Sequence, residues 1–339
     1  MSDAPSTVDD AAEYAEERAA IFRGSHRALL DRWLRQPIEL RRFAGPVRHV
    51  EQLDHLRVAH LTDMHFGRVT PERVQREAVR LTNAQSPDLV VITGDFVCHS
   101  QMYLDQMVDV LSGIEAPVVG VLGNHDYWSG ADGVHKALTR AGVEILKNRH
   151  TTITLRHERL QIVGLDDAYT GHADREKAVK GLRADLPTIG LSHIAEEADW
   201  LWHHGVPLVL AGHTHAGQIT LARLHELAVG KLAGHKYVHG LYGSRRPDEN
   251  GGPKGALYVG AGIGAAVMPF RIGERGRREI ALFELGLSVG SIAEHHGEQR
   301  PLPGRAPSRE VTERRRAAVK KKEARRLRRE LRRAWRELR

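Results

Sequence analysis

Five short apolar runs in this chain each end in residues that can bind a metal ion. Each run is rich in Val, Ile and Leu, the composition of a buried strand in a parallel sheet. The residues at or just beyond the carboxyl ends are Asp63 and His65, Asp95, Asn124 with His125 and Asp126, His193, and His213 with His215. Because open α/β sheets hold ligands beyond the carboxyl ends of their strands, the pattern predicts an α/β fold with one polar site.

The spacing of these residues indicates what kind of site they form. Residues i and i+2 of an extended chain point the same way, so Asp63 with His65, and His213 with His215, form two same-face pairs. Carboxylate, amide and imidazole donors together suit Mn, Fe or Zn. This donor set needs no thiolate, so Cys98, the single cysteine, is not required.

Each motif alone has an ordinary structural explanation. Histidines cap strands and form hydrogen bonds in protein cores, Gly-Asn pairs form turns, and Gly-Asp after an apolar run is common. The occurrence of five such elements in one chain, each after a strand-like run, nevertheless favours a metal site over coincidence.

The motifs and their order resemble those of the calcineurin-like metallophosphoesterases. DMH, GD, GNHD, SH and GHTHAGQ carry the resemblance, and GLDD at 164–167 is typical of a bacterial branch of the family. GLY at 240–242 and the stretch 258–285 extend it, so that it covers residues 56–285. The resemblance implies two mixed β-sheets packed as a sandwich and flanked by helices, with the metals at its rim.

The resemblance also implies which residues hold the metals and what the site does. One metal is expected to bind Asp63, His65, Asp95 and His215. The other is expected to bind Asp95, Asn124, His193 and His213, with Asp95 as the bridge. A metal-bound hydroxide would then hydrolyse a phosphomonoester, phosphodiester or pyrophosphate. His125 is expected to protonate the leaving oxygen or orient the phosphate, and Asp126 to fix the tautomer of His125 through a hydrogen bond.

Two other motifs are excluded, and the chain departs from the family pattern at Ala261, as it does after His193. The glycine-rich run at 260–265 formally fits a dinucleotide fingerprint, but Pro269 and the glycines after it prevent the helix that must follow. The run at 190–194 lacks the second glycine of a nucleophile elbow. Ala261 stands where relatives commonly carry an arginine, so one phosphate contact is expected to be missing.

Composition predicts a cytoplasmic protein. One cysteine excludes an internal disulfide framework, which indicates a reducing compartment. No apolar run has the length of a membrane-spanning helix, and the acidic N-terminus is expected to carry no export signal.

Positive charge is concentrated at the C-terminus. Residues 305–339 contain 16 Lys/Arg and 5 Asp/Glu, a net charge of +11, so the chain before them carries −4 of the total of +7. Together with the motifs, this predicts four segments. They are an N-terminal acidic then basic amphipathic helical segment at 1–48, a catalytic domain at 49–285, a Gly/Pro-containing linker at 286–308 and a basic C-terminal helix at 309–339.

The predicted C-terminal helix has a narrow apolar stripe at Leu327, Leu331, Ala334 and Leu338. A basic helix with such a stripe suits an anionic membrane surface, which would place the protein peripherally at the inner face of the membrane. A solvated charged helix is the main alternative, and binding of nucleic acid or another polyanion is less favoured. Because every expected ligand precedes the helix, its deletion is expected to leave turnover of a small soluble phosphoester nearly unchanged.

The sequence therefore predicts a dinuclear metal-dependent phosphoesterase. One close branch of the family that it resembles cleaves the pyrophosphate of UDP-2,3-diacylglucosamine, and a membrane-seeking tail would fit such a lipid-linked substrate. The alternatives are a non-catalytic metal-binding scaffold and a polyanion-binding protein that acts through its basic tail. Retention of the expected ligands and of His125 favours the enzyme over the scaffold.

Overall fold

Two β-sheets form the centre of the protein in a computed structural model, which describes residues 37–50, 52–217, 233–246, 255–266, 271, 276–305 and 307–337. The first sheet contains, in spatial order, β1 (Glu39–Ala44), β12 (Glu279–Leu285), β2 (Leu56–Leu61), β3 (Leu89–Thr93), β4 (Val118–Val121) and β5 (Val143–Ile145). The second contains β10 (Gly240–Gly243), β11 (Ala256–Val259), β9 (Leu208–Ala211), β8 (Thr188–Leu191), β7 (Glu158–Gly164) and β6 (Arg149–Leu155).

Both sheets are mixed. In the first, β2 to β5 run parallel, and β12 is antiparallel to β2. In the second, β7, β8, β9 and β11 run parallel, and the edge strands β6 and β10 are antiparallel to their neighbours. Within each sheet the parallel strands bring their carboxyl ends to one edge, where the predicted metal ligands follow them.

Alternate residues of the central strands face different layers of the core. In β2, Val58 belongs to the apolar cluster shared by the two sheets, whereas Ala59 and Leu61 belong to the cluster between the first sheet and its helices. This is the period of two that a strand imposes. Every residue of β3, β4, β8 and β9 is buried, which explains why these strands read as continuous apolar runs.

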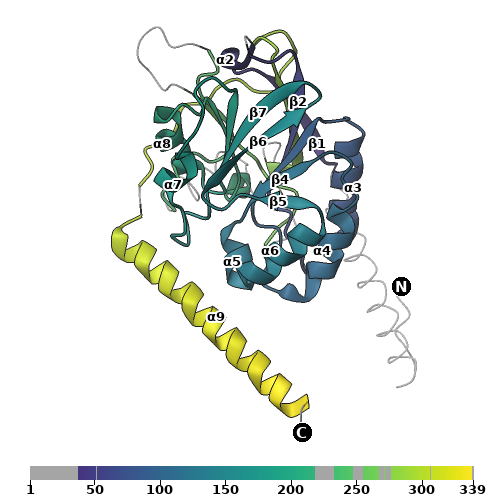
Figure 1. Cartoon of the computed structure of the whole chain (residues 1–339), viewed down its shortest axis with the longest axis vertical. Coiled ribbons are helices and arrows are strands. Elements are labelled where there is room, and N and C mark those ends of the chain that lie inside the picture. The colour runs from purple at the N-terminus through teal and green to yellow at the C-terminus, as the bar shows by residue number, and fades with distance from the viewer. Residues whose placement is uncertain are drawn as a thin grey trace, which may run out of the picture. The chain divides into compact units, whose positions relative to one another are not determined.

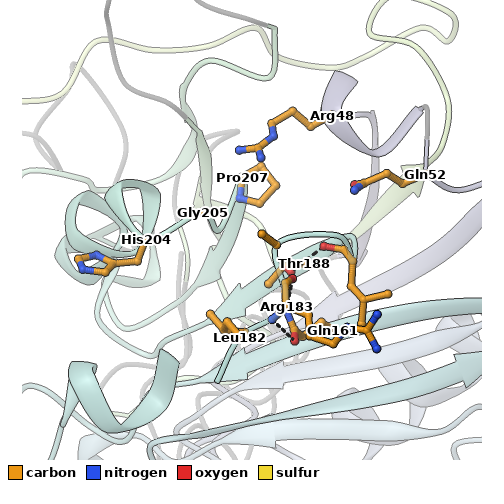
Figure 2. Close-up of a pocket in the computed structure, with 11 residues that line it drawn as sticks. Arg48, Gln52, Gln161, Leu182, Arg183, Thr188, His204, Gly205 and Pro207 are labelled. Atoms are coloured by element: carbon orange, nitrogen blue, oxygen red, sulfur yellow. Dashed lines mark hydrogen bonds between the residues drawn. The ribbon is translucent and has the colours of Figure 1, made fainter. Parts of the chain in front are cut away.

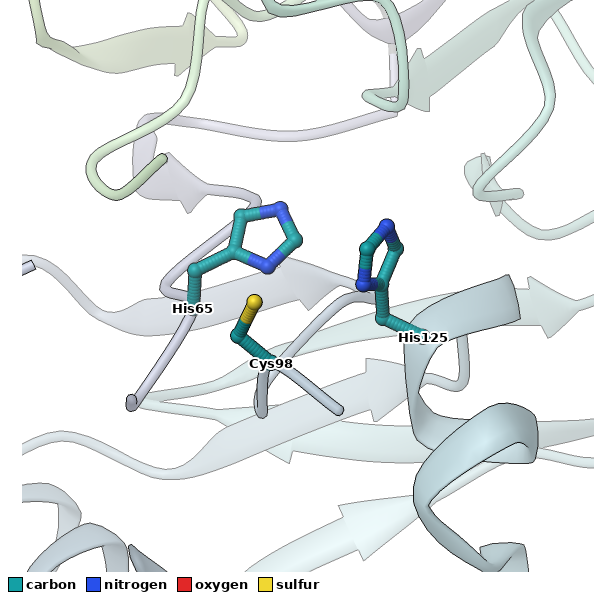
Figure 3. A group of neighbouring side chains, drawn as sticks. All are labelled: His65, Cys98 and His125. Carbon is teal, nitrogen blue, oxygen red and sulfur yellow. The ribbon is translucent and has the colours of Figure 1, made fainter. Parts of the chain in front are cut away.

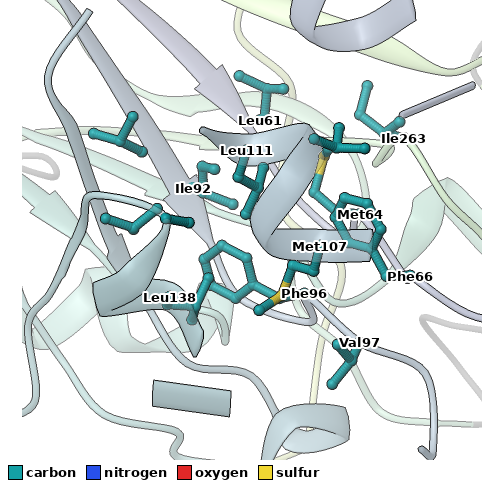
Figure 4. Packing of buried hydrophobic residues seen from close by; sticks show 14 of the residues in the cluster. Leu61, Met64, Phe66, Ile92, Phe96, Val97, Met107, Leu111, Leu138 and Ile263 are labelled. Carbon is teal, nitrogen blue, oxygen red and sulfur yellow. The ribbon is translucent and has the colours of Figure 1, made fainter. Parts of the chain in front are cut away.

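Helices cover the outer faces of both sheets. They are α3 (Glu72–Asn83), α4 (Leu104–Leu111), α5 (Asn124–Ser129), α6 (Ala131–Arg140), α7 (Arg175–Val179) and α8 (Ala198–His203), and the short helix α2 (Val47–Val50) precedes β2. Met107 of α4 and Leu138 of α6 pack with Ile92 of the first sheet (Figure 4). Leu201 of α8 packs with Val209 of the second sheet, and Figure 1 shows α7 and α8 on the side away from α3, α4 and α6. The predicted sandwich of two mixed sheets flanked by helices is confirmed.

Strand β1 extends the catalytic domain towards the N-terminus. It pairs in parallel with β12, and Ile38–Arg339 form one compact unit. The domain boundary predicted at residue 49 is therefore wrong. The basic residues of β1 concealed the strand, because Arg41 is buried in an ion pair and is not solvated. The rest of the predicted N-terminal helical segment, residues 1–36, lies outside the described residues.

The segment that follows β12 lies against the second sheet. The backbone N–H of Gln299 donates to the carbonyl of Leu241 at 2.7 Å, and Arg245 pairs with Glu294 at 2.6 Å. The part of the predicted linker that is described is thus held in place by specific contacts. Beyond it, α9 (Arg309–Glu337) is a single helix of 29 residues, drawn in yellow in Figure 1. None of the helices in the described ranges has the length and hydropathy that crossing a bilayer requires.

A buried ion pair joins β1 to β12 behind the predicted site. Glu279 accepts from Arg41 at 2.5 Å, from the Tyr258 hydroxyl at 2.8 Å and from the Ala261 backbone N–H at 2.9 Å. His239 Nε2 lies 3.1 Å from the same carboxylate. Burial acts to raise the pKa of Glu279, but His239 and Arg41 outweigh it and hold the pKa well below its usual value. The carboxylate therefore fixes both the strand pair and the loop that begins at Ala261.

Replacing Glu279 with alanine is expected to lower the free energy of unfolding by about 3–5 kcal/mol, because the buried Arg41 guanidinium loses its main counter-charge. Glu144→Ala breaks the exposed Glu144–Arg149 pair and is expected to cost less than about 1 kcal/mol. Urea unfolding of both variants measures the difference. A loss at Glu279 no larger than that at Glu144 would show that the buried pair does not hold β1 in place.

Candidate metal centre

The loops after five strands bring the predicted metal ligands together. Asp63 and His65 follow β2, Asp95 follows β3, and Asn124 follows β4 at the first position of α5. His193 follows β8, and His213 and His215 follow β9. Because these strands are parallel within their sheets, their following loops share one rim of the sandwich, as the sequence pattern predicts.

One group of donors consists of Asp63, His65, Asp95 and His215, whose ligand atoms all lie within 4.8 Å of one another. Asp63 Oδ1 lies 3.3 Å from His215 Nε2 and 3.8 Å from His65 Nε2. His65 Nε2 lies 3.6 Å from Asp95 Oδ2 and 2.9 Å from His215 Nε2. Four donors from three loops thus surround one small volume.

A second group consists of Asp95, His193 and His213, again within 4.8 Å. His193 Nε2 lies 3.3 Å from Asp95 Oδ2 and 3.2 Å from both His213 Nδ1 and the side-chain oxygen of Asn124. Asp95 therefore belongs to both groups, and Asn124 lies at the second. This arrangement is compatible with two adjacent ions that share one carboxylate.

The donor atoms are arranged as metal ligands. Without a cation, the same arrangement of buried polar atoms would be unfavourable. Asp63 Oδ1 is buried and accepts no hydrogen bond within the part of the chain that the structure describes. The Nε2 atoms of His65 and His215, both basic nitrogens, face each other at 2.9 Å. Buried carboxylates and imidazoles that converge in this way are stabilised by a cation, and mixed N and O donors suit Mn, Fe or Zn.

The backbone at the site adopts conformations that cost free energy. Asp63, His65, Asp95, His213 and His215 all have positive φ angles, between 45° and 76°. Such conformations cost on the order of 1–3 kcal/mol each and persist where the surrounding structure enforces them, commonly at functional sites. The three loops that carry these residues are therefore held in the geometry that directs the donors inward.

Neighbouring groups orient the donors. His193 Nδ1 lies 2.8 Å from the Thr93 carbonyl, so this nitrogen carries the proton and Nε2 faces Asp95. Asp95 Oδ1 accepts the backbone N–H of His125 at 2.8 Å. A Cβ on Gly123 would lie 2.3 Å from Asp95 Oδ1, so only glycine lets the loop approach this carboxylate. Such supporting contacts fix the tautomer and direction of metal ligands.

Charges within the site are strongly coupled. Burial raises the pKa of Asp63 to about 7. Burial opposes charge on His193, but the adjacent Asp95 outweighs it and raises the pKa of His193 to about 10. In the metal-free chain His193 therefore carries a proton that a metal has to displace, so metal affinity falls as the pH falls.

Asp126 does not take the role that the sequence predicts. Its Oδ1 accepts the Val97 backbone N–H at 3.1 Å and its Oδ2 accepts the Gly123 backbone N–H at 2.9 Å. His125 Nδ1 has no hydrogen-bond partner among the described residues. The prediction that Asp126 fixes the tautomer of His125 is therefore wrong. Asp126 instead joins the β3 and β4 loops, because a buried carboxylate at the start of α5 lies close to unpaired backbone donors.

An aromatic rim surrounds His125 and was not predicted. The ring centroids of His99 and Trp128 lie 4.4 Å and 4.7 Å from that of His125. Tyr169 lies 6.0 Å from Trp128 and 5.2 Å from His213. Trp128 follows His125 by three residues on α5, a helical spacing that could have revealed it. Tyr169 follows the GLDD motif, whose Asp167 accepts from the backbone of Tyr169 at 3.2 Å.

Cys98 lies at the site although the donor set does not require it. Figure 3 shows its thiol between the rings of His65 and His125, with the three ligand atoms within 4.8 Å of one another. The thiol donates to the Ala266 carbonyl at 3.4 Å. Burial raises the pKa of Cys98 to about 11, so the metal-free site holds a neutral thiol rather than a thiolate.

Arg271 places a guanidinium at the site. The sequence predicts that an arginine contact is missing here, because Ala261 stands where relatives commonly carry an arginine. Its Nη2 lies 3.3 Å from His215 Nδ1, and Nη1 donates to the Ala261 carbonyl at 2.5 Å. The glycine-rich loop runs so close to the ligands that a Cβ on Gly264 would lie 2.8 Å from His65 Cβ. Arg271 lies within the stretch 258–285 that carries the family resemblance, and this stretch was the available signal. The loop thus supports the metal ligands rather than a dinucleotide.

A pocket at the opposite end of the second sheet lies away from these residues (Figure 2). It is lined at the amino ends of β8 and β9 by Arg48, Gln52, Gln161, Leu182, Arg183, Ala184, Leu186, Thr188, His204, Gly205 and Pro207. Gln161 donates to Thr188 and accepts from the Arg183 backbone, so its polar groups are paired with the protein. None of the predicted ligands lines it.

Comparison with known proteins agrees with the geometry. Residues 56–217 match the family described as calcineurin-like phosphoesterase. The chain belongs to this family. The predicted resemblance is thereby confirmed, and the protein is a metallophosphoesterase, a hydrolase of phosphoric esters. Members of the family bind a dinuclear metal centre, which the two buried groups of donors match.

Several similar proteins cover most of the catalytic domain. Phosphodiesterase YaeI of Escherichia coli is 28% identical over 62% of this chain and 75% of that protein. UDP-2,3-diacylglucosamine pyrophosphatase LpxG of Chlamydia muridarum is 26% identical over 62% of this chain and 79% of that protein. A transmembrane protein with metallophosphoesterase domain from Danio rerio is 32% identical over 66% of this chain, which spans only 52% of that protein's length.

Proposed function

We propose that the protein hydrolyses phosphate diesters or pyrophosphates at a centre of two metal ions. Asp63, His65, Asp95 and His215 would hold one ion, and Asp95, Asn124, His193 and His213 the other. The observation that carries this assignment is the position of Asp95, whose carboxylate lies in both groups of donors. Two bound ions would supply a nucleophile at neutral pH and offset charge on the phosphoryl oxygens.

His125 is the residue proposed to act on the substrate. Its side chain is 12% exposed, more than His65 or His193, and its Nε2 lies 4.0 Å from Asp95 Oδ2. A ring at the edge of both donor groups can donate to a phosphate oxygen or to the leaving oxygen. The aromatic rim of His99, Trp128 and Tyr169 restricts water and orients the substrate's organic part.

The substrate class is proposed from the relatives. YaeI is named a phosphodiesterase, and LpxG is named a pyrophosphatase of UDP-2,3-diacylglucosamine. We therefore place a lipid-linked pyrophosphate of this type first among the candidates. The test is a screen of purified protein, loaded with Mn, Fe or Zn in turn, against a phosphomonoester, a phosphodiester and UDP-2,3-diacylglucosamine. Metal-dependent release of UMP would support the pyrophosphate, and turnover of the diester alone would assign the protein to general phosphodiesterases.

The end of α9 is proposed to bind an anionic membrane surface. Leu327 is 57% exposed on a helix dense in Lys and Arg. A variant that ends at Arg326 is expected to bind vesicles containing phosphatidylglycerol less tightly than the full chain, because it loses the apolar stripe and six of the tail's basic residues. Salt should weaken binding of the full chain by screening.

Co-sedimentation with anionic and neutral vesicles at two salt concentrations measures this difference. Duplex DNA added as a competitor separates the membrane from other polyanions. Equal retention of the full chain and the shortened variant would rule out the membrane proposal. Preferential capture by DNA would favour the alternative that the tail binds nucleic acid or another polyanion.

A further inference from the structure

The part of α9 from Arg315 to Arg326 packs on the catalytic domain beside the proposed metal centre. Val319 is 2% exposed and belongs to the apolar cluster between the first sheet and its helices. The Arg326 guanidinium donates to the carbonyl of Ser129, the last residue of α5, at 2.9 Å. Helix α5 begins at Asn124 and carries His125, so α9 is attached to the element that presents both.

This packing alters the expected effect of deleting residues 309–339. The deletion would expose the apolar surface under Val319 and remove the cation that binds the end of α5. The expectation that turnover of a small phosphoester is nearly unchanged was based on the position of the ligands in the sequence alone. That expectation assumes that the helix is separate from the site, and the contacts of α9 contradict this assumption.

Two cations of α9 lie at opposite sides of the aromatic rim. The Arg315 guanidinium lies over the Tyr169 ring, 3.7 Å from its centroid, and Tyr169 in turn neighbours His213. Lys322 lies near His99, whose pKa is lowered by burial and by the Lys322 ammonium. Arg315 and Lys322 are seven residues apart, and so they share the face of the helix that also carries Val319.

The chemistry of both side chains suits a phosphate group. Stacking on a ring occupies the face of a guanidinium, while its N–H groups lie in the plane and can bind an anion in a bidentate manner. Lys322 is an exposed residue. The chain before residue 305 has a net charge of −4, so α9 supplies positive charge that the catalytic domain itself lacks.

We propose that α9 forms one wall of the active site and that Arg315 and Lys322 bind a second anionic group of the substrate, beyond the phosphate that is hydrolysed. The inference rests on the proposed phosphoesterase function and makes its substrate class narrower. The preferred substrates are pyrophosphates, whose second phosphate is this anionic group, and phosphodiesters that carry a further phosphate. The family match ends at residue 217, so this specificity belongs to a part of the chain outside it.

Two probes that differ in one phosphate test the inference. Thymidine 5′-(4-nitrophenyl phosphate) and its 3′-phosphorylated form share the same diester and the same leaving group. The full-length protein is expected to have a kcat/KM at least about tenfold higher for the 3′-phosphorylated probe. Arg315→Ala and Lys322→Ala are each expected to reduce this preference severalfold, mainly through KM, since they remove binding and not chemistry.

Matched variants separate a direct contact from a general effect of charge. Lys321→Ala removes the same charge from the adjacent position, about 100° around the helix, and is expected to leave the preference unchanged. Lys322→Arg and Arg315→Lys keep the cations and should restore much of it. Melting temperatures of all variants show whether α9 still packs through Val319.

The outcomes distinguish the inference from the function on which it rests. Absence of turnover of both probes by the metal-loaded full-length protein would contradict the proposed function. Turnover without any preference for the 3′-phosphorylated probe, or an equal loss of preference in Lys321→Ala, would overturn the role of α9 and leave the phosphoesterase intact. Loss of preference confined to Arg315→Ala and Lys322→Ala supports it.

Discussion

Replacing Asp95 with asparagine is expected to lower kcat by at least about a thousandfold and to reduce the bound metal to one ion or none. The carboxylate is the only side chain that lies in both groups of donors, and an amide is a weak, neutral ligand. Loss of the bridge removes several kcal/mol of charge stabilisation at the phosphoryl group, and each 1.4 kcal/mol corresponds to about tenfold in rate. Metal analysis and turnover of the same preparation measure both effects.

The matched control is Asp126→Asn. Asp126 is as deeply buried as Asp95 and belongs to the same rim, but both of its oxygens accept backbone N–H groups. This variant is expected to lose stability and to keep both ions. Normal metal content in Asp95→Asn, or metal loss only in Asp126→Asn, would contradict the assignment of Asp95 as the bridge.

His125→Ala is expected to lower kcat by about 10²–10⁴ while both metals remain bound, because the ring is proposed to act on the substrate and lies outside both proposed ligand sets. If His125 protonates the leaving oxygen, the loss should shrink for 4-nitrophenyl esters, whose leaving group needs little protonation. If His125 only orients the phosphate, the loss should be the same for good and poor leaving groups.

His99→Ala is the control for this variant. His99 contacts the ring of His125 but lies further from both groups of donors, so its removal is expected to change kcat far less. Loss of metal in His125→Ala would mean that the ring is a ligand. Equal losses in the two variants would mean that the aromatic rim, rather than His125, carries the effect.

The two sheets and the loops that carry the donors could be predicted from the sequence, because both depend on local patterns. Buried parallel strands such as β3 read as continuous apolar runs, and their carboxyl ends must share one rim. Other contacts at and behind the site depend on tertiary structure and could not be predicted in this way. Arg271 reaches His215 from 56 positions away, and Arg41 is buried only because Glu279 lies opposite it. Neither pairing can be inferred from residues that are adjacent in the sequence.

The C-terminal helix shows the same limit. Its charge and helical spacing are visible in the sequence, and a helix is present over Arg309–Glu337. Its most apolar stripe, however, begins at Leu327, which is exposed, whereas Val319 within the basic part is buried. Periodicity reveals which residues share a face of a helix, but not whether another part of the chain covers that face.

The number of metal ions required for turnover is the measurement that tests the proposed function most directly. Protein stripped with a chelator should be inactive towards a phosphodiester. Activity should return as Mn, Fe or Zn is added and reach its plateau at two ions per chain, counted by elemental analysis of the same samples. Full turnover by stripped protein, or a plateau at one ion per chain, would contradict a dinuclear centre bridged by Asp95.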